Sequence, residues 1–376
     1  MSYLDHAATT PLHPEVLRVM QQVLSESYGN PSSTHQWGRK AREWVEQARK
    51  SMAQDLGCKA AQMLFTSGAT ESIQAVIMGL AQSGRVHALI SNRMEHQAVL
   101  QTLEVAAQRF GLPILWVNND SEGRLDLDHF EVLLHTYPQS LVALMHVNNE
   151  TGVIHAVDHI GTLCRRYSSY YLCDCTQSVG KTPLQFNDLA VDFALGSAHK
   201  FNGPKGVGFL YAREPQLLPA WQWGGEQEKG LRAGTEAVHQ CVGMATALHL
   251  ALEALSAHIT EWTALQQLAR TQLLTHFPGV QFHGHEPFMT LLHFSLPWPA
   301  ALASMLVFRC DLAGVAVSRG SACQSGSSRP SHVLAQMCTP EQLQRPSLRI
   351  SWGLGSTQAD IDALIHALRA VAPSQT

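Results

Sequence analysis

The stretch YYLCDCTQSVGKTPLQFNDLAVDFALGSAHK, residues 170–200, decides the fold. It contains two short apolar runs, YYLCD at 170–174 and VDFALGS at 191–197, of the kind found in strands that are buried on both faces of a sheet. Polar residues follow directly after each run. Because ligands bind at the carboxyl ends of strands in open α/β sheets, we expect the chemistry to lie where these two runs end.

The alternation of apolar and amphipathic segments extends from this stretch towards the N-terminus. Apolar runs occur as VHALIS (86–91), PILWV (113–117) and SLVALMH (140–146), and amphipathic stretches occur at 97–110, 126–135 and 155–168. Strands that alternate with helices pair in parallel, because each helix carries the chain back across the sheet. The sequence therefore predicts an α/β fold with a mostly parallel sheet covered by helices on both faces.

The pattern changes in the C-terminal third of the chain. Helical patterns occur at about 234–256 and 258–277, followed by MTLLHFSL (289–296), a helix at 299–310, VAVS (315–318) and a last helix near 358–371. A chain of 376 residues exceeds the size at which one hydrophobic core stops growing. We therefore predict a large domain of residues 15–255 and a smaller α+β domain formed by residues 1–14 and 256–376.

Composition limits the classes of function. With 45% hydrophobic and 15% charged residues, the chain has a globular composition and not a disordered one. The net charge is -4 and no Lys/Arg-rich block occurs, which argues against nucleic acid and membrane surfaces as direct partners. There is neither a signal-peptide pattern nor an apolar span of about 20 residues, so we expect a cytoplasmic protein.

The eight cysteines are scattered along the chain, without the dense spacing of a disulfide-stapled domain, so we expect reduced thiols. Cys173 and Cys175 form the one close pair and would point to the same face of a strand. Because no second pair lies nearby, two buried strand cysteines are a better interpretation than a metal site. We expect no metal.

Two motifs suggest a reactive lysine and a phosphate site. Lys200 ends SAHK after the second apolar run, where a desolvated lysine could form a Schiff base; a surface lysine in a turn is the alternative. TSGATES, residues 66–72, is a glycine-containing turn before a helical pattern. Its backbone N–H groups and the hydroxyls of Thr70 and Ser72 could cradle a phosphate, although a helix cap without a ligand is equally compatible.

Three further side chains are candidates for contact with a flat heteroaromatic ring. Asp174 ends the first apolar run and could pair with a protonated pyridine nitrogen, with Gln177 three residues later. The alternative is an aspartate that caps the next helix. His96, in MEHQAV, could lie against the ring or move a proton, although a chain with twenty histidines has mostly structural ones.

Cys323 lies between small residues in VSRGSACQSG, residues 317–326. The surrounding segment from Arg319 to Pro346 is rich in Ser, Gly and Pro and contains only one short apolar piece, HVLAQM. We therefore predict a mobile surface loop over about 319–346, on which a thiol could travel to a substrate and away again. An incidental loop cysteine is the alternative.

Taken together, these motifs resemble those of one enzyme family, the cysteine desulfurases. Eleven segments carry the resemblance in order along the chain: YLDHAATTP, GNPSSTH, FTSGATES, EHQAV, MHVNNETG, DCTQSVGK, SAHKFNGPKG, GGEQEKGLRAGTE, RGSAC, RPSHVL and LRISWG. The resemblance implies the pyridoxal 5'-phosphate (PLP) transferase fold of type I, which is aspartate-aminotransferase-like. In that fold a large, mostly parallel seven-stranded sheet domain is joined to a smaller α+β domain.

The resemblance also implies a role for each matching residue. Lys200 would form the Schiff base with PLP, Asp174 would pair with the pyridine nitrogen, and His96 would stack on the ring and move protons. Gln177 and Asn149 would bracket the phenolic oxygen, and Arg349 would bind the substrate carboxylate. The phosphate would be held by Ala69, Thr70, Ser197 and His199, and by Thr235 from the other subunit of a homodimer.

The sequence departs from the family pattern at three places. Ile73-Gln74 follow TSGATES where the family usually has two Asn or Asp-Asn, so a polar contact beneath the cofactor would be missing. Arg319 stands where a small residue is common, and its charge would favour the thiolate of Cys323. Cys175 replaces a common alanine beside Asp174, for which we expect only an effect on packing.

The implied reaction is removal of sulfur from L-cysteine, giving L-alanine and a persulfide on Cys323 that passes to an acceptor protein. Iron–sulfur cluster assembly, tRNA thiolation and DNA phosphorothioation all draw on enzymes of this kind. Alternatives with the same Lys200 are a selenocysteine lyase and a direct cysteine C–S lyase, which would need no swinging thiol. A non-enzymatic sulfur-relay partner is a poorer interpretation, because the chemistry-bearing residues are all retained.

Overall fold

The computed structural model describes residues 1–320 and 331–373 and contains a seven-stranded sheet in the order β2-β8-β7-β6-β5-β3-β4. Its strands are β2 (Met63–Thr66), β3 (Leu89–Ser91), β4 (Ile114–Trp116), β5 (Leu141–Ala143), β6 (Tyr170–Asp174), β7 (Phe193–Ser197) and β8 (Gly208–Ala212). Only β8 is antiparallel to its neighbours in this sheet. The predicted mostly parallel, seven-stranded sheet is confirmed.

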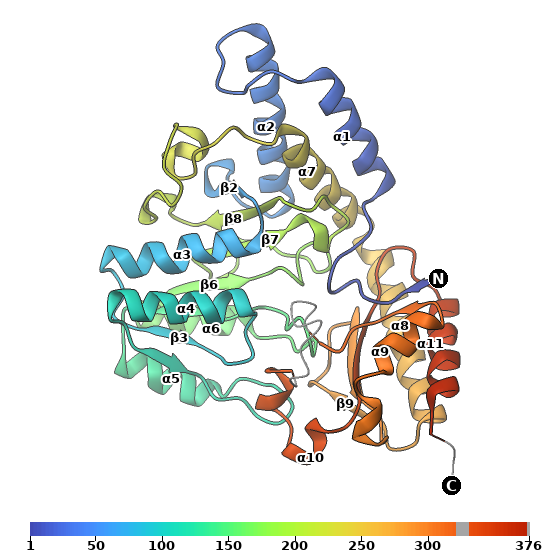
Figure 1. Ribbon diagram of the computed structural model, residues 1–376. Coiled ribbons are helices and arrows are strands. Elements are labelled where there is room, and N and C mark those ends of the chain that lie inside the picture. The colour runs from blue at the N-terminus through green and yellow to red at the C-terminus, as the bar shows by residue number, and fades with distance from the viewer. Residues whose placement is uncertain (321–330, 374–376) are drawn as a thin grey trace.

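Helices cover both faces of this sheet (Figure 1). They are α1 (Pro14–Glu26), α2 (Gln36–Asp55), α3 (Ala69–Ser83), α4 (Gln97–Phe110), α5 (Leu127–Thr136), α6 (Val157–Arg166) and α7 (Val238–Glu253). Leu89 and Ile90 are neighbours on β3, yet Leu89 packs in the core with α3 and α4 and Ile90 in the core with α5 and α6. Because successive strand residues face opposite sides, burial of both faces explains the continuous apolar runs.

The C-terminal part has its own core, which includes Leu4 from the N-terminal segment together with Trp262, Phe294, Trp352 and Leu364. Its strands are β1 (Ser2–Tyr3), paired with β11 (Val315–Ala316), and a sheet of β9 (Gln281–His283), β10 (Leu291–Ser295) and β12 (Ser347–Ser351). Its helices are α8 (Leu255–His276), α9 (Leu306–Leu312), α10 (Pro340–Leu343) and α11 (Gln358–Val371). The domain bounds 15–255 and 256–376 stay a prediction.

Two predictions from the sequence were wrong in part. The helix predicted at 299–310 is a 3-10 turn, Ala300–Leu302, followed by the separate helix α9. Between them, the N–H of Met305 donates to the carbonyl of Leu302, three residues back, and not four residues back as in an α-helix. The loop predicted over 319–346 is folded in its second half. Val333 and Met337 pack with Met94 in a small buried cluster, so this half is held by apolar contacts. Cys323 lies outside the described residues.

The cysteines of the described segments are free thiols, as predicted. Cys173 and Cys175 are both buried, with their sulfur atoms 3.6 Å apart at the end of β6. In these segments no single helix has the length and apolar character to cross a membrane. The pair α7 and α8 passes a test of length and composition together, but the chain bends by 71° between them.

Candidate active site

A cavity of about 510 Å³ lies where β5, β6 and β7 end, and we call it the strand-end cavity. Residues from the whole length of the sequence meet on its walls. The predicted residues that line it are Ala69, Thr70, His96, Asn149, Asp174, Gln177, Ser197, His199, Lys200 and Arg349. The carboxyl ends of the parallel strands thus bring the separate motifs together, as the sheet topology requires.

Lys200 reaches this cavity from a 3-10 turn, Ala198–Lys200, that follows β7 directly. Its amine donates to the carbonyl oxygens of Ala7 at 2.7 Å and Ala8 at 2.8 Å. Sequence reasoning missed both acceptors, although they belong to the motif YLDHAATTP. The N-terminal segment therefore positions the amine, and a backbone carbonyl gives no residue-specific signal in a sequence.

Asp174 and Gln177 lie side by side on the same wall. One carboxylate oxygen of the buried Asp174 accepts from the backbone N–H of Thr176 at 2.9 Å. No helix begins in the described residues between β6 and β7, so the alternative of an aspartate that caps the next helix is wrong. Gln177 donates from its side-chain amide to the carbonyl of Ala7 at 2.9 Å. The same carbonyl accepts from Lys200, so Ala7 fixes two of the predicted residues relative to one another.

His96 is the N-cap of α4, and its Nδ1 accepts from the backbone N–H of Ala98 at 3.1 Å. In the neutral ring the proton is therefore on Nε2. Burial lowers the pKa of His96, and the nearby carboxylate of Asp174 opposes that shift. The imidazole is thus neutral at neutral pH and keeps Nε2 for contacts within the strand-end cavity.

The turn before α3 has the properties of an anion site. Gly68 precedes the helix with a φ of 154°, and no side chain caps the helix there. A Cβ on the neighbouring strand residue Gly208 would lie 2.7 Å from the Cα of Gly68, so only glycine allows this approach. The first N–H groups of α3 therefore lie at the strand-end cavity with the hydroxyls of Thr70 and Ser197 nearby.

Arg349 lies on β12 and is almost completely buried. Its guanidinium donates to the carboxylate of Asp5 at 2.8 Å and to the backbone carbonyl of Asn149 at 2.8 Å. Its Nε has no partner in the described structure. Asp5 was not predicted as part of the site, and it orients the arginine from the N-terminal segment.

One other predicted residue, Thr235, does not line the strand-end cavity. It lies on a neighbouring cavity of about 140 Å³ with Ser67 and Arg232. Its predicted contact comes from a second copy of the chain and stays a prediction. Of the departures from the family pattern, Ile73 is buried in the core with α4, and Gln74 is exposed.

Lys200 also lines a second cavity, of about 250 Å³, which we call the Lys181 cavity. Its other walls include Lys181, His258, Trp262 and Trp352. Burial lowers the pKa of Lys181 to about 7, and the positive charges of Lys200 and Arg349 add to the shift. The amine of Lys181 donates to the side-chain oxygen of Gln177 at 3.3 Å, which links the two cavities. Sequence reasoning did not single out Lys181.

The fold and this arrangement of residues define a transferase of the aspartate-aminotransferase-like class. The aminotransferase class-V family model matches residues 2–364, so the chain belongs to that family and, by the relatives below, to its cysteine desulfurases. The cysteine desulfurase IscS of Dictyoglomus turgidum is 36% identical, covering 99% of this chain and 96% of its own. The putative cysteine desulfurase IscS 1 of Bacillus subtilis is also 36% identical, with 96% and 95% covered.

The solved structures agree with this family. A structure described as a NifS-like protein superimposes with a TM-score of 0.89 and 31% identity, covering 99% of this chain and 98% of its own. The cofactor of the family is PLP, and the donor set of the strand-end cavity fits it. The uncapped N-terminus of α3 suits a phosphate, Asp174 suits a pyridinium nitrogen, and Lys200 supplies an amine.

Proposed function

We propose that this chain removes sulfur from L-cysteine with PLP, releasing L-alanine and leaving the sulfur as a persulfide on Cys323. The observation that carries the proposal is the meeting of Lys200, Asp174 and Arg349 on one cavity, in a chain that matches cysteine desulfurases over nearly its whole length. A neighbouring structure, titled SspA in complex with cysteine, has a TM-score of 0.81 and 29% identity and supports L-cysteine as the substrate.

Four residues of the strand-end cavity then have roles in the reaction. When bound, PLP supplies an electron sink for the substrate carbon. Lys200 holds the cofactor aldehyde and moves the Cα proton of the substrate. Asp174 keeps the pyridine nitrogen protonated, and His96, neutral and with its proton on Nε2, moves protons near the substrate.

Arg349 orients the substrate. Its planar fork of donors suits a carboxylate, and Asp5 and the carbonyl of Asn149 hold the fork in place before any substrate binds. The sulfur step is a displacement: the thiolate of Cys323 attacks the substrate sulfur, the C–S bond breaks, and the substrate carbon takes a proton and leaves as alanine.

The assembly around this reaction is also part of the proposal. We infer a homodimer in which Thr235 of one subunit contacts the phosphate bound by the other, and a sulfur-acceptor protein that receives the persulfide. The pathway that the acceptor serves, whether iron–sulfur cluster assembly, tRNA thiolation or DNA phosphorothioation, depends on its own surface. The cytoplasmic location stays a prediction.

The decisive experiment measures alanine and sulfide from L-cysteine with a thiol reductant, for the wild type, Lys200→Ala and Cys323→Ala. We expect equal amounts of both products from the wild type and a loss of about a thousandfold or more in each variant. An active Cys323→Ala variant would identify a direct C–S lyase. Activity with selenocysteine but not with cysteine would instead favour the selenocysteine lyase.

A further inference from the structure

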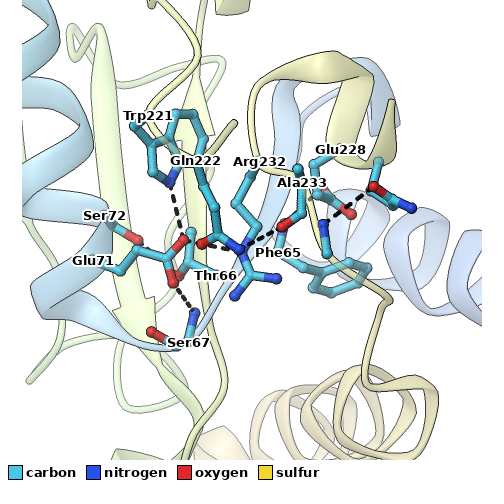
Figure 2. Close-up of polar contacts among 12 residues, drawn as sticks. Phe65, Thr66, Ser67, Glu71, Ser72, Trp221, Gln222, Glu228, Arg232 and Ala233 are labelled. Atoms are coloured by element: carbon cyan, nitrogen blue, oxygen red, sulfur yellow. Dashed lines mark hydrogen bonds and ion pairs between the residues drawn. The ribbon is translucent and has the colours of Figure 1, made fainter. Parts of the chain in front are cut away.

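Glu71 is an acidic residue in the first turn of α3, beside the proposed phosphate site. Its carboxylate accepts from the backbone N–H of Ser67 at 2.7 Å, from Nε1 of Trp221 at 3.0 Å and from Nε of Arg232 at 3.1 Å (Figure 2). The side chain of Glu71 is 17% exposed and that of Arg232 22% exposed, so solvent screens this pair only in part. Glu71 also lines the strand-end cavity.

The position of Glu71 poses an electrostatic problem. A carboxylate on the wall of a cavity that takes a phosphate repels it, and the repulsion is strong where solvent is partly excluded. Burial alone would raise the pKa of Glu71, but the hydrogen bonds from Trp221, Arg232 and Ser67 outweigh burial and hold the pKa below its usual value. Glu71 is therefore ionised at neutral pH, and the phosphate site carries this charge permanently.

We propose that Arg232 and Glu71 form a positioning pair for the cofactor phosphate. Glu71 holds the turn at Ser67 in shape, and Arg232 neutralises Glu71 so that the turn accepts a dianion. The inference rests on the proposed function, because it needs the phosphate of PLP at this turn. It assigns Arg232, which lines the neighbouring cavity with Thr235, to the cofactor site through its partner Glu71.

The segment that carries Arg232 is held firmly enough for this role. Glu228 accepts from Arg49 at 2.7 Å and from the backbone N–H of Phe65 at 2.9 Å, and the side chains of Arg49 and Glu228 are both buried. Gln222 donates to the carbonyl of Ala233, next to Arg232 (Figure 2). Two carboxylates thus anchor alternate N–H groups of one strand end, at Phe65 through Glu228 and at Ser67 through Glu71.

The proposal predicts an unusual pattern of mutational effects on PLP affinity. Arg232→Gln leaves the carboxylate of Glu71 without its counter-charge, so PLP affinity should fall by about tenfold. Glu71→Gln removes the repelling charge, so affinity should stay within about threefold of the wild type. Glu71→Gln should therefore restore most of the PLP affinity in the Arg232→Gln background. If the two residues only hold the fold, the double variant should instead bind PLP more weakly than Arg232→Gln.

The experiment measures dissociation constants of PLP and of pyridoxal for the full chain after removal of its cofactor. Pyridoxal forms the same bond to Lys200 but has no phosphate, so the ratio of the two constants reports the phosphate site. The four proteins are the wild type, Arg232→Gln, Glu71→Gln and the double variant. Arg124→Gln is the matched control, because Arg124 forms an exposed ion pair with Asp120. Arg232→Lys should keep most of the ratio.

Two outcomes overturn the inference, and they are distinguishable. If the wild type binds PLP no more tightly than pyridoxal, the proposed phosphate site is wrong, and the pair falls with it. If the wild type prefers PLP but Arg232→Gln weakens both ligands equally, or the double variant is no better than Arg232→Gln, the proposed function stands and the positioning pair is wrong. Thermal unfolding of each apo variant identifies a protein that has failed to fold.

Discussion

The strand-end cavity and the Lys181 cavity both have Lys200 on their walls, but they differ in how their side chains are held in place. On the strand-end cavity, Arg349, His96 and Gln177 are each bonded to a backbone atom. On the Lys181 cavity, the Nδ1 atom of His258 is buried without a partner in the described structure, and burial lowers the pKa of Lys181.

This difference shows which cavity is organised for ligand binding. Side chains that are held by backbone atoms have their orientation fixed before a ligand arrives, so little reorganisation accompanies binding. A buried lysine without a counter-charge instead opposes the folded state until it loses its proton. The strand-end cavity is therefore the candidate site that we propose, whereas burial of Lys181 at the other cavity destabilises the fold by an amount that depends on pH.

Among substitutions that test the difference between the two cavities, Arg349→Leu is expected to have the largest effect on stability and substrate binding. The substitution leaves the carboxylate of Asp5 and the carbonyl of Asn149 without their donor, and we expect about 3 kcal/mol less stability. It also removes the proposed carboxylate contact, so KM for L-cysteine should rise by about a hundredfold. Urea unfolding and steady-state kinetics measure the two effects separately.

A conservative variant distinguishes charge from geometry at this position. Arg349→Lys keeps the positive charge but loses the planar fork, so it should recover part of the stability and little of the substrate affinity. A KM close to that of the wild type in Arg349→Leu would contradict the proposed role, whatever happens to stability.

The same comparison explains how much could be predicted from the sequence. The strands around Asp174 and Lys200 were predicted because parallel-sheet strands leave apolar runs, and the motifs at their ends were specific. Arg232 was missed because its partner Glu71 lies far along the chain. Carbonyl acceptors such as that of Ala7 were missed because every residue has one.

The fold was predicted least well in segments that contain only a few apolar residues. The segment after residue 330 read as a loop because HVLAQM is too short for a periodic pattern, yet Val333 is fully buried in the small cluster with Met94 and Met337. That burial depends on Met94, which is more than two hundred positions away. Ser331 also donates to the carboxylate of Glu150. Long-range contacts of this kind leave no local pattern in a sequence.

The next effect is expected from Lys181→Met; it concerns stability alone and has a definite pH dependence. The folded-state pKa of Lys181 is about 7, below the usual 10.5, so between these values the unfolded chain binds a proton that the folded chain does not. Wild-type stability therefore rises with pH from about 7 towards 10. Lys181→Met lacks this rise and should be more stable than the wild type at pH 7, by on the order of 3 kcal/mol.

Denaturant unfolding at several pH values tests this expectation, with Lys205→Met as the control because Lys205 is exposed. The stability difference between Lys181→Met and the wild type should shrink as pH rises. A difference that is constant from pH 7 to pH 10 would show that Lys181 contributes through its bond to Gln177 and not through a buried charge.

The smallest effect is expected from Cys175→Ala. Cys175 lines neither cavity, so this substitution tests core packing apart from both of them. The thiol is buried in the core beside Cys173, so its removal leaves a small void and should destabilise the fold by about 1 kcal/mol. PLP affinity and KM should not change, because Asp174 keeps its own bond to Thr176. A tenfold weaker affinity for PLP would mean that core packing behind β6, and not the backbone contacts within the strand-end cavity, sets the position of Asp174.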